Sequence, residues 1–189
     1  MPENFTLDGA EYALRPMTPD EKAALLRFAE ALPPHDLLFV ARDITKRPVV
    51  DAWIAQEEEG SIATMLAEQD GELVGCAALV RDPLSWSPHV GEVRVLVAEK
   101  ARAHGLGRRL IEETMRGALD KELTRLIARM TPDQKAAITV FEEMGFSGEA
   151  LLKDHVRDAD GTYHDIVILA CDVPRVAAQI EAMGIGEDG

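Results

Sequence analysis

Residues 102–107 read Arg-Ala-His-Gly-Leu-Gly, and they join a run rich in β-branched residues to a segment with helical periodicity. The run at 89–97 predicts a strand. Apolar residues at 106, 110, 111, 115 and 118 predict a helix. A helix N-terminus offers free N–H groups, and glycine lets a ligand approach the backbone. We expect this turn to bind an anionic group that carries phosphate, although a turn of this kind also occurs where only strand–helix packing requires it.

Three arginines, Arg102, Arg108 and Arg109, lie in or beside this turn and favour the same anionic ligand. Two common phosphate motifs are excluded. The sequence has no Gly-Lys-Ser or Gly-Lys-Thr, so it lacks a P-loop. Leu110 stands where a dinucleotide fingerprint requires its third glycine, which argues against a Rossmann site.

The chain of 189 residues has 20 Lys and Arg against 34 Asp and Glu, a formal net charge of −14. So acidic a protein repels nucleic acid and anionic lipid, and it attracts cationic partners. No apolar run approaches the length that spans a bilayer, and the N-terminus has no leader pattern. Two cysteines in apolar runs suit a reducing compartment, so we expect a cytoplasmic protein without a membrane or nucleic-acid partner. The five histidines show no metal-ligand spacing, and we expect no metal.

The rest of the pattern predicts one mixed α/β domain over residues 1–189, with a core at about 11–172. We expect a hairpin or a strand at 6–15 and helices at 18–31, 48–58 and 133–144. Strands are expected at 62–68, 72–81 and 123–130, and a hairpin of 150–157 with 163–172. Thr18 and Glu21 form a capping-box pattern at the first helix. A terminal helix at about 174–183 carries an apolar stripe of Val176, Ile180 and Met183. This stripe either seals a homodimer or, as we expect, docks on its own core.

Two motifs in this order resemble the GNAT superfamily of acyl-CoA-dependent N-acetyltransferases. The first is Arg/Gln-x-x-Gly-x-Gly/Ala after a central strand, and Arg102, Gly105 and Gly107 match it. The second is aromatic-x-x-x-Gly-Phe, matched by residues 141–146. The resemblance covers about Glu11 to Asp172. It implies an α/β (α+β) fold, with a central, mixed, mostly antiparallel sheet flanked by helices on both faces, and acetyl-CoA as cosubstrate.

The resemblance also implies the cofactor-binding residues. The backbone of Leu96 and Val97 would pair with the pantetheine arm, and Gln134 stands where an Asn is common beside the cofactor. Phe141 occupies the place where many members have a tyrosine that protonates the leaving thiolate. The residues whose backbone would hold the pyrophosphate are Arg102, Ala103, His104, Gly105, Leu106, Gly107 and Arg108.

An amine must lose a proton before it attacks a thioester. Glu92 occupies the place of a glutamate general base in the lysine-acetylating branch, and partial burial that raised its pKa would suit that role. Alternatively, Glu92 caps the strand edge or pairs with Arg94. His89 is a second candidate base.

We expect an N-acetyltransferase acting on a primary amine: a protein lysine, a polyamine or a small amine. Glu92 with Phe141, and the acidic surface, favour a lysine slightly. The acceptor site would be lined by segments 33–47, 82–89 and 158–163. Tyr163 either lies near the acceptor or has a structural role in the core or a turn. A non-catalytic acyl-CoA-binding sensor or assembly module is the alternative, and an acyl group other than acetyl, such as succinyl, stays open.

Overall fold

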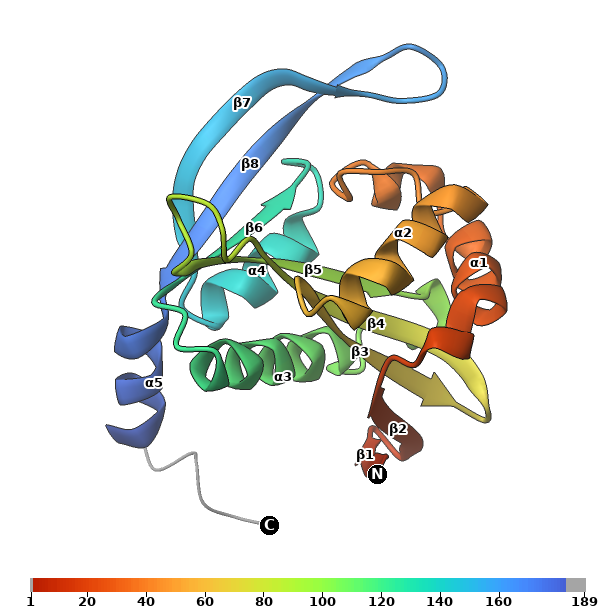
Figure 1. Ribbon diagram of the computed structural model, residues 1–189, viewed down its shortest axis with the longest axis horizontal. Helices are drawn as coiled ribbons and strands as arrows, with labels where there is room; N and C mark the ends of the chain where they lie inside the picture. The colour runs from red at the N-terminus through yellow and green to blue at the C-terminus, as the bar shows by residue number, and fades with distance from the viewer. Residues whose placement is uncertain (1, 183–189) are drawn as a thin grey trace.

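The protein is built around one eight-stranded sheet in the computed structural model, which describes residues 2–182 (Figure 1). The strand order is β1-β2-β3-β4-β5-β6-β8-β7. In this described part of the chain only β5 and β6 pair in parallel; the other neighbouring strands are antiparallel. The expected mixed, mostly antiparallel sheet is therefore confirmed. The strands are β1 Glu3–Leu7, β2 Ala10–Pro16, β3 Ile62–Gln69, β4 Glu72–Arg81, β5 Val90–Val97, β6 Arg125–Met130, β7 Ser147–Arg157 and β8 Tyr163–Asp172.

Helices cover both faces of the sheet, also as expected. α1 and α2 pack on one face, together with Leu66, Cys76 and Leu96 of the central strands. α3 and α4 cover the other face, where α3 contacts β3, β4 and β5. The helices are η1 Pro19–Glu21, α1 Lys22–Ala31, η2 Pro34–Leu37, α2 Arg47–Glu58, η3 Glu99–Ala101, α3 Leu106–Asp120, α4 Lys135–Glu143 and α5 Val173–Ala182.

Strand β4 shows why the sheet needs helices on both sides. Its residues from Val74 to Leu79 are all buried. Because neighbouring side chains in a strand point to opposite faces, Cys76 packs under α1 and α2, while Ala77 and Leu79 pack toward α3. A continuous apolar run of this kind is typical of a strand covered on both faces.

The start of the first predicted helix differs from the expected capping box. The chain forms the short 3₁₀ helix η1 before α1, and Thr18 makes no side-chain cap. The carboxylate of Glu21 pairs with the guanidinium of Arg15, which also pairs with Glu68 of β3. Glu21 Oε1 also accepts a hydrogen bond from Thr18 Oγ1 at 3.2 Å, so the two predicted partners meet through their side chains and not through the backbone N–H groups of a capping box.

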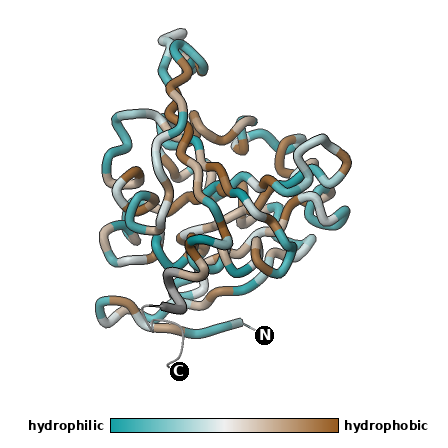
Figure 2. The backbone as a smooth tube through the Cα atoms, turned by 90° about the vertical axis from the view of Figure 1, so that its left-hand side faces the viewer, coloured by the Kyte–Doolittle hydropathy of each residue, from teal (hydrophilic) through white to brown (hydrophobic). Residues whose placement is uncertain are grey.

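The β7–β8 hairpin and α5 pack differently against the rest of the chain. β7 and β8 form a long hairpin that projects from the body of the molecule (Figure 2), and β7 is mostly exposed at the edge of the sheet. In α5, Val176 is buried in the main core cluster, so this part of the stripe docks on its own chain. The side chain of Ile180, and Met183 itself, lie outside the described residues. Among residues 2–182 no helix combines the length and apolar character needed to cross a membrane.

Candidate active site

Strands β5 and β6 separate part-way along their length. They pair only from Val90 to Val93, although β5 continues to Val97. On its other side, β5 stays paired with β4 as far as Val97. One edge of the Leu96–Val97 backbone therefore has no strand beside it within the described part of the chain. An extended ligand can add to such an edge as a further strand does.

The turn after β5 ends at an uncapped helix. Ala103 and Gly105 adopt left-handed φ values of 64° and 85°, and α3 begins at Leu106. Gly105 is the N-cap residue and provides no side-chain hydrogen bond. The first N–H groups of a helix have no partner within that helix. These groups and the positive end of the helix dipole form a site suited to phosphate.

Gly107, in the first turn of α3, is not required by the packing of the chain. A Cβ atom added there would meet only Val97 Cγ2, at 3.9 Å. By contrast, a Cβ at Gly91 would lie 2.8 Å from Leu79 Cδ1. Packing thus explains Gly91, whereas the space beside Gly107 is open to a ligand.

The three arginines near this turn are not free cations. Arg102 Nη2 lies 2.5 Å from Asp36 Oδ2, and its Nε donates to the carbonyl oxygen of Val97 at 3.0 Å. Arg108 pairs with Glu112 and Glu143. Arg109 is largely buried, pairs with Glu3 and Glu113, and stacks over Phe5. The positive character of the turn comes chiefly from the helix end. His104 holds the turn to the β1–β2 hairpin through Asp8, with Nδ1 and Oδ2 3.0 Å apart.

Glu92 lies on β5 on the same face as Arg94 and Leu96, and its side chain is 13% exposed. Its Oε1 accepts a hydrogen bond from Arg94 Nε at 2.9 Å, and its Oε2 lies 3.9 Å from Arg129 Nε. The Glu92–Arg94 ion pair, expected from the sequence as an alternative to a catalytic role, is therefore formed. His89 is exposed, and its carbonyl oxygen accepts from the N–H groups of Thr124 and Arg125 at the start of β6.

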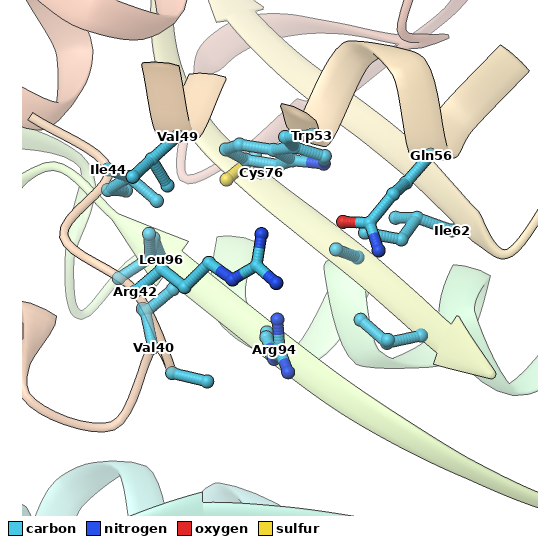
Figure 3. A pocket seen from close by; sticks show the side chains of 13 residues that line it. Val40, Arg42, Ile44, Val49, Trp53, Gln56, Ile62, Cys76, Arg94 and Leu96 are labelled. Atoms are coloured by element: carbon cyan, nitrogen blue, oxygen red, sulfur yellow. The ribbon is translucent and has the colours of Figure 1, made fainter. Parts of the chain in front are cut away.

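A cavity of about 210 Å³ opens between the sheet and α2 on this same face (Figure 3). Its floor includes Arg94 and Leu96, so it reaches the free part of β5. Of the three segments expected around the acceptor, 33–47 contributes residues 40–42 and 44, while 82–89 and 158–163 contribute none of the described lining residues.

The sequence profile of the acetyltransferase (GNAT) family matches residues 25–146, well over half of the chain. The matched region runs from α1 through the phosphate turn to the end of the Gly-Phe motif. The chain belongs to the GNAT acetyltransferase family. It is thus an acyltransferase of a family that uses acetyl-CoA.

Solved structures share this GNAT fold at low sequence identity. A ribosomal-protein-alanine N-acetyltransferase from Brucella melitensis has a TM-score of 0.71 and 23% identity, covering 84% of this chain and 98% of its own. The structure of yncA from Salmonella typhimurium, solved with acetyl-CoA, has a TM-score of 0.71 and 18% identity, and the match covers 86% of this chain and 94% of its own. A spermidine N-acetyltransferase from Vibrio cholerae, in complex with CoA and spermine, has a TM-score of 0.73 and 14% identity, and the match covers 88% of this chain and 98% of its own.

Two residues expected beside the cofactor, Phe141 and Gln134, have partners within the chain. Phe141 of α4 is buried and packs edge-to-face on Phe146, with ring centroids 5.0 Å apart. Its ring has no proton to donate. Gln134 is the N-cap residue of α4, and its Oε1 accepts from the backbone N–H of Thr131 at 3.2 Å. That amide oxygen therefore holds the β6–α4 connection.

The structure also joins histidines that sequence spacing does not connect. His35 of η2 lies 2.8 Å from Asp133 Oδ2, and its ring packs edge-to-face on His164, which lies 2.8 Å from Asp158 Oδ2. The hydrogen bond from His164 lowers the pKa of Asp158. No local pattern signals this contact, because its members come from three distant segments: η2, the β6–α4 connection and the β7–β8 hairpin. Among residues 2–182 no group of three or more potential ligands is arranged to hold a metal ion.

Proposed function

We propose that the protein transfers the acetyl group of acetyl-CoA to a primary amine, with Glu92 as the general base. One observation carries this proposal: strand β5, whose edge is free at Leu96 and Val97, leads from a cavity whose floor includes Leu96 to the uncapped end of α3. A nucleotide-bearing thioester and a small acceptor would meet at this point.

The residues present fit acetyl-CoA. The backbone of Leu96 and Val97 would pair with the pantetheine arm, and the N–H groups of residues 102–108 would hold the pyrophosphate beside the open space at Gly107. Gln134 and Phe141 would border the cofactor from α4. When bound, acetyl-CoA supplies an acetyl group activated as a thioester.

Transfer requires two proton movements. The acceptor nitrogen forms a bond to the acetyl carbonyl carbon while the C–S bond breaks. Glu92 takes the proton that the amine loses, and in doing so it exchanges its bond to Arg94 for one to the acceptor. Phe141 cannot protonate the leaving sulfur, so that proton comes from solvent.

The cofactor site is tested by calorimetric titration with acetyl-CoA, using two glycine substitutions in the same helix. G107E fills the open space and adds a negative charge, so we expect wild-type affinity in the micromolar range to fall at least ~100-fold. G117A is the matched control, because a Cβ there meets only Leu79 Cδ2 at 3.8 Å. We expect it to bind as the wild type does. Wild-type protein that does not bind acetyl-CoA would overturn the proposal.

The base is tested by E92Q, with E72Q as a control at an exposed glutamate on β4. Loss of general-base catalysis reduces the rate by about 10²- to 10⁴-fold, and the affinity for acetyl-CoA should not change. Transfer by E92Q at the wild-type rate would exclude Glu92 as the base. Acetyl-CoA binding without transfer to any amine would favour the alternative, a non-catalytic acyl-CoA-binding module; the Glu92–Arg94 pair and Phe141 are the features that support it.

A further inference from the structure

The cavity above β5 has apolar walls and a cationic centre. The apolar lining comes from α2, the segment before it, and the central strands: Val40, Ala41, Ile44, Val49, Trp53, Ile62, Cys76, Ala78, Val80 and Leu96. Gln56 adds one amide. The charged members of the lining are Arg42 and Arg94, and both guanidinium groups point toward the middle of the cavity (Figure 3).

Neither guanidinium is fully paired. Among residues 2–182, no carboxylate lies within ion-pair distance of Arg42, and its side chain makes no hydrogen bond there. Arg94 donates through Nε to Glu92, which leaves its two terminal nitrogens without a hydrogen bond from the described chain. Arg42 is exposed and Arg94 is partly buried. Two like charges that face one cavity repel each other unless an anion lies between them.

The positive charge of the cavity lining is opposite in sign to the net charge of the molecule. The chain carries −14 overall, and the turn arginines are each matched by a carboxylate. Arg42, which has no carboxylate partner among residues 2–182, and the free terminal nitrogens of Arg94 therefore stand out as a local recognition feature. A planar guanidinium binds a carboxylate through two parallel hydrogen bonds, which adds geometry to charge.

The size of the cavity limits the ligand. At about 210 Å³ it is smaller than the ~300–1,000 Å³ typical of sites for drug-sized ligands, so it suits a compact metabolite. A polyamine or a lysine side chain would bring an ammonium group toward two guanidinium groups, which is unfavourable. An amine that also carries a carboxylate avoids this repulsion.

We propose that the acceptor is a small amino carboxylic acid with a compact apolar side chain. Its carboxylate binds between Arg42 and Arg94, its side chain packs against Trp53 and the aliphatic wall, and its amine lies toward Glu92. This assignment rests on the proposed acetyl transfer and names its acceptor class. It replaces the preference for a protein lysine.

The test uses ligand pairs that differ only in the anion. L-leucine and L-leucinamide share the amine and the side chain, but only leucine has a carboxylate; L-methionine, L-phenylalanine, spermidine and a lysine peptide complete the panel. Binding is measured without acetyl-CoA by calorimetry, and turnover by release of CoA thiol. We expect at least one of the three amino acids to bind and to be acetylated, and leucinamide, spermidine and the peptide to be poor acceptors.

The variant pair is R42A with R27A as control, since Arg27 is an exposed arginine of α1 away from the cavity. Loss of one charge-assisted contact should raise Kd and KM for the amino acid about 10- to 100-fold in R42A and leave R27A unchanged. R42A should keep its affinity for acetyl-CoA.

Three results would overturn the assignment: equal use of leucine and leucinamide, unchanged Kd in R42A, or no binding of any amino acid in the panel. If acetyl-CoA binds and other amines are acetylated, the proposed transferase function stands and only the acceptor class is wrong. If acetyl-CoA itself does not bind, the function proposal fails first.

Discussion

The arginines of the phosphate turn show how much a residue's partners change its role. Arg102 joins the end of β5 to Asp36 of η2 through a hydrogen bond to Val97 and an ion pair. It therefore links the turn before α3 to the segment that continues into the cavity above β5. A phosphate bound by this side chain would therefore lie close to the carboxylate of Asp36.

Cys76 lines the cavity above β5, and burial makes its thiol unreactive. Burial raises the pKa of Cys76 from 9.0 to about 12, and that of Cys171 to about 11. The thiolate is the reactive form, so at about pH 8 we expect iodoacetamide to label the folded protein at least ~100-fold more slowly than the urea-unfolded chain. Mass spectrometry of the labelled peptides measures both rates.

The same pKa shift sets a direction for alkaline stability. Above about pH 9 the thiols of the unfolded chain ionise while the buried thiols stay protonated, so the free energy of unfolding falls as pH rises toward 12. Rapid labelling of Cys76 in the native protein would contradict this description of the cavity wall.

At the scale of elements, α2 is fixed to the sheet by a small polar group. Trp53 Nε1 donates to Thr64 Oγ1 at 3.0 Å, and Thr64 N–H donates to Glu57 Oε1 at 3.1 Å. The other oxygen, Glu57 Oε2, is buried without a partner in the described chain. These bonds hold the wall of the cavity against β3.

Burial raises the pKa of Glu57, so this residue favours folding in its protonated form. Its contribution is present below the unfolded pKa near 4.5 and is lost as pH rises through the higher folded value. We expect E57Q to increase the free energy of unfolding by about 1 kcal/mol at pH 7, because a neutral amide replaces the buried carboxylate. Near pH 4 the gain should vanish.

Urea unfolding at both pH values measures the effect of E57Q. The neighbouring E58Q, at an exposed position of the same helix, removes the same charge without the burial. If E57Q increased the free energy of unfolding equally at both pH values, or if E58Q increased it as much, burial of the Glu57 carboxylate would not destabilise the folded state.

At the scale of the whole molecule, the charge of −14 opposes the approach of a polyanionic cofactor. Because the turn arginines are paired with carboxylates, little local positive field offsets this repulsion. We expect the association rate of acetyl-CoA to rise several-fold between about 0.02 M and about 0.5 M salt, as screening shortens the range of the repulsion.

Stopped-flow fluorescence measures that rate, and uncharged acetyl-pantetheine is the control that should show no salt dependence. A rate that falls with salt would mean that local positive charge at α3 governs the encounter, as in most phosphate-binding proteins.

The sequence by itself determined the features that depend on near neighbours. The strand, glycine turn and helix around residues 102–107 were predictable because periodicity and glycine placement act locally, and the Gly-Phe motif in its expected order identified the family and hence the sheet. Element ends shifted by about two residues, as at β6 and α4.

Tertiary structure alone decided which charges meet. Glu21 paired with Arg15 instead of capping a backbone N–H group, His35 met His164, and Arg42 was left without a carboxylate partner among residues 2–182 in the cavity that Arg94 also lines. Charged side chains on loops and strand ends take whichever partner the fold brings near, and sequence separation carries no information about that. The family was therefore readable from the chain, whereas the acceptor class became arguable only once these distant residues shared one cavity.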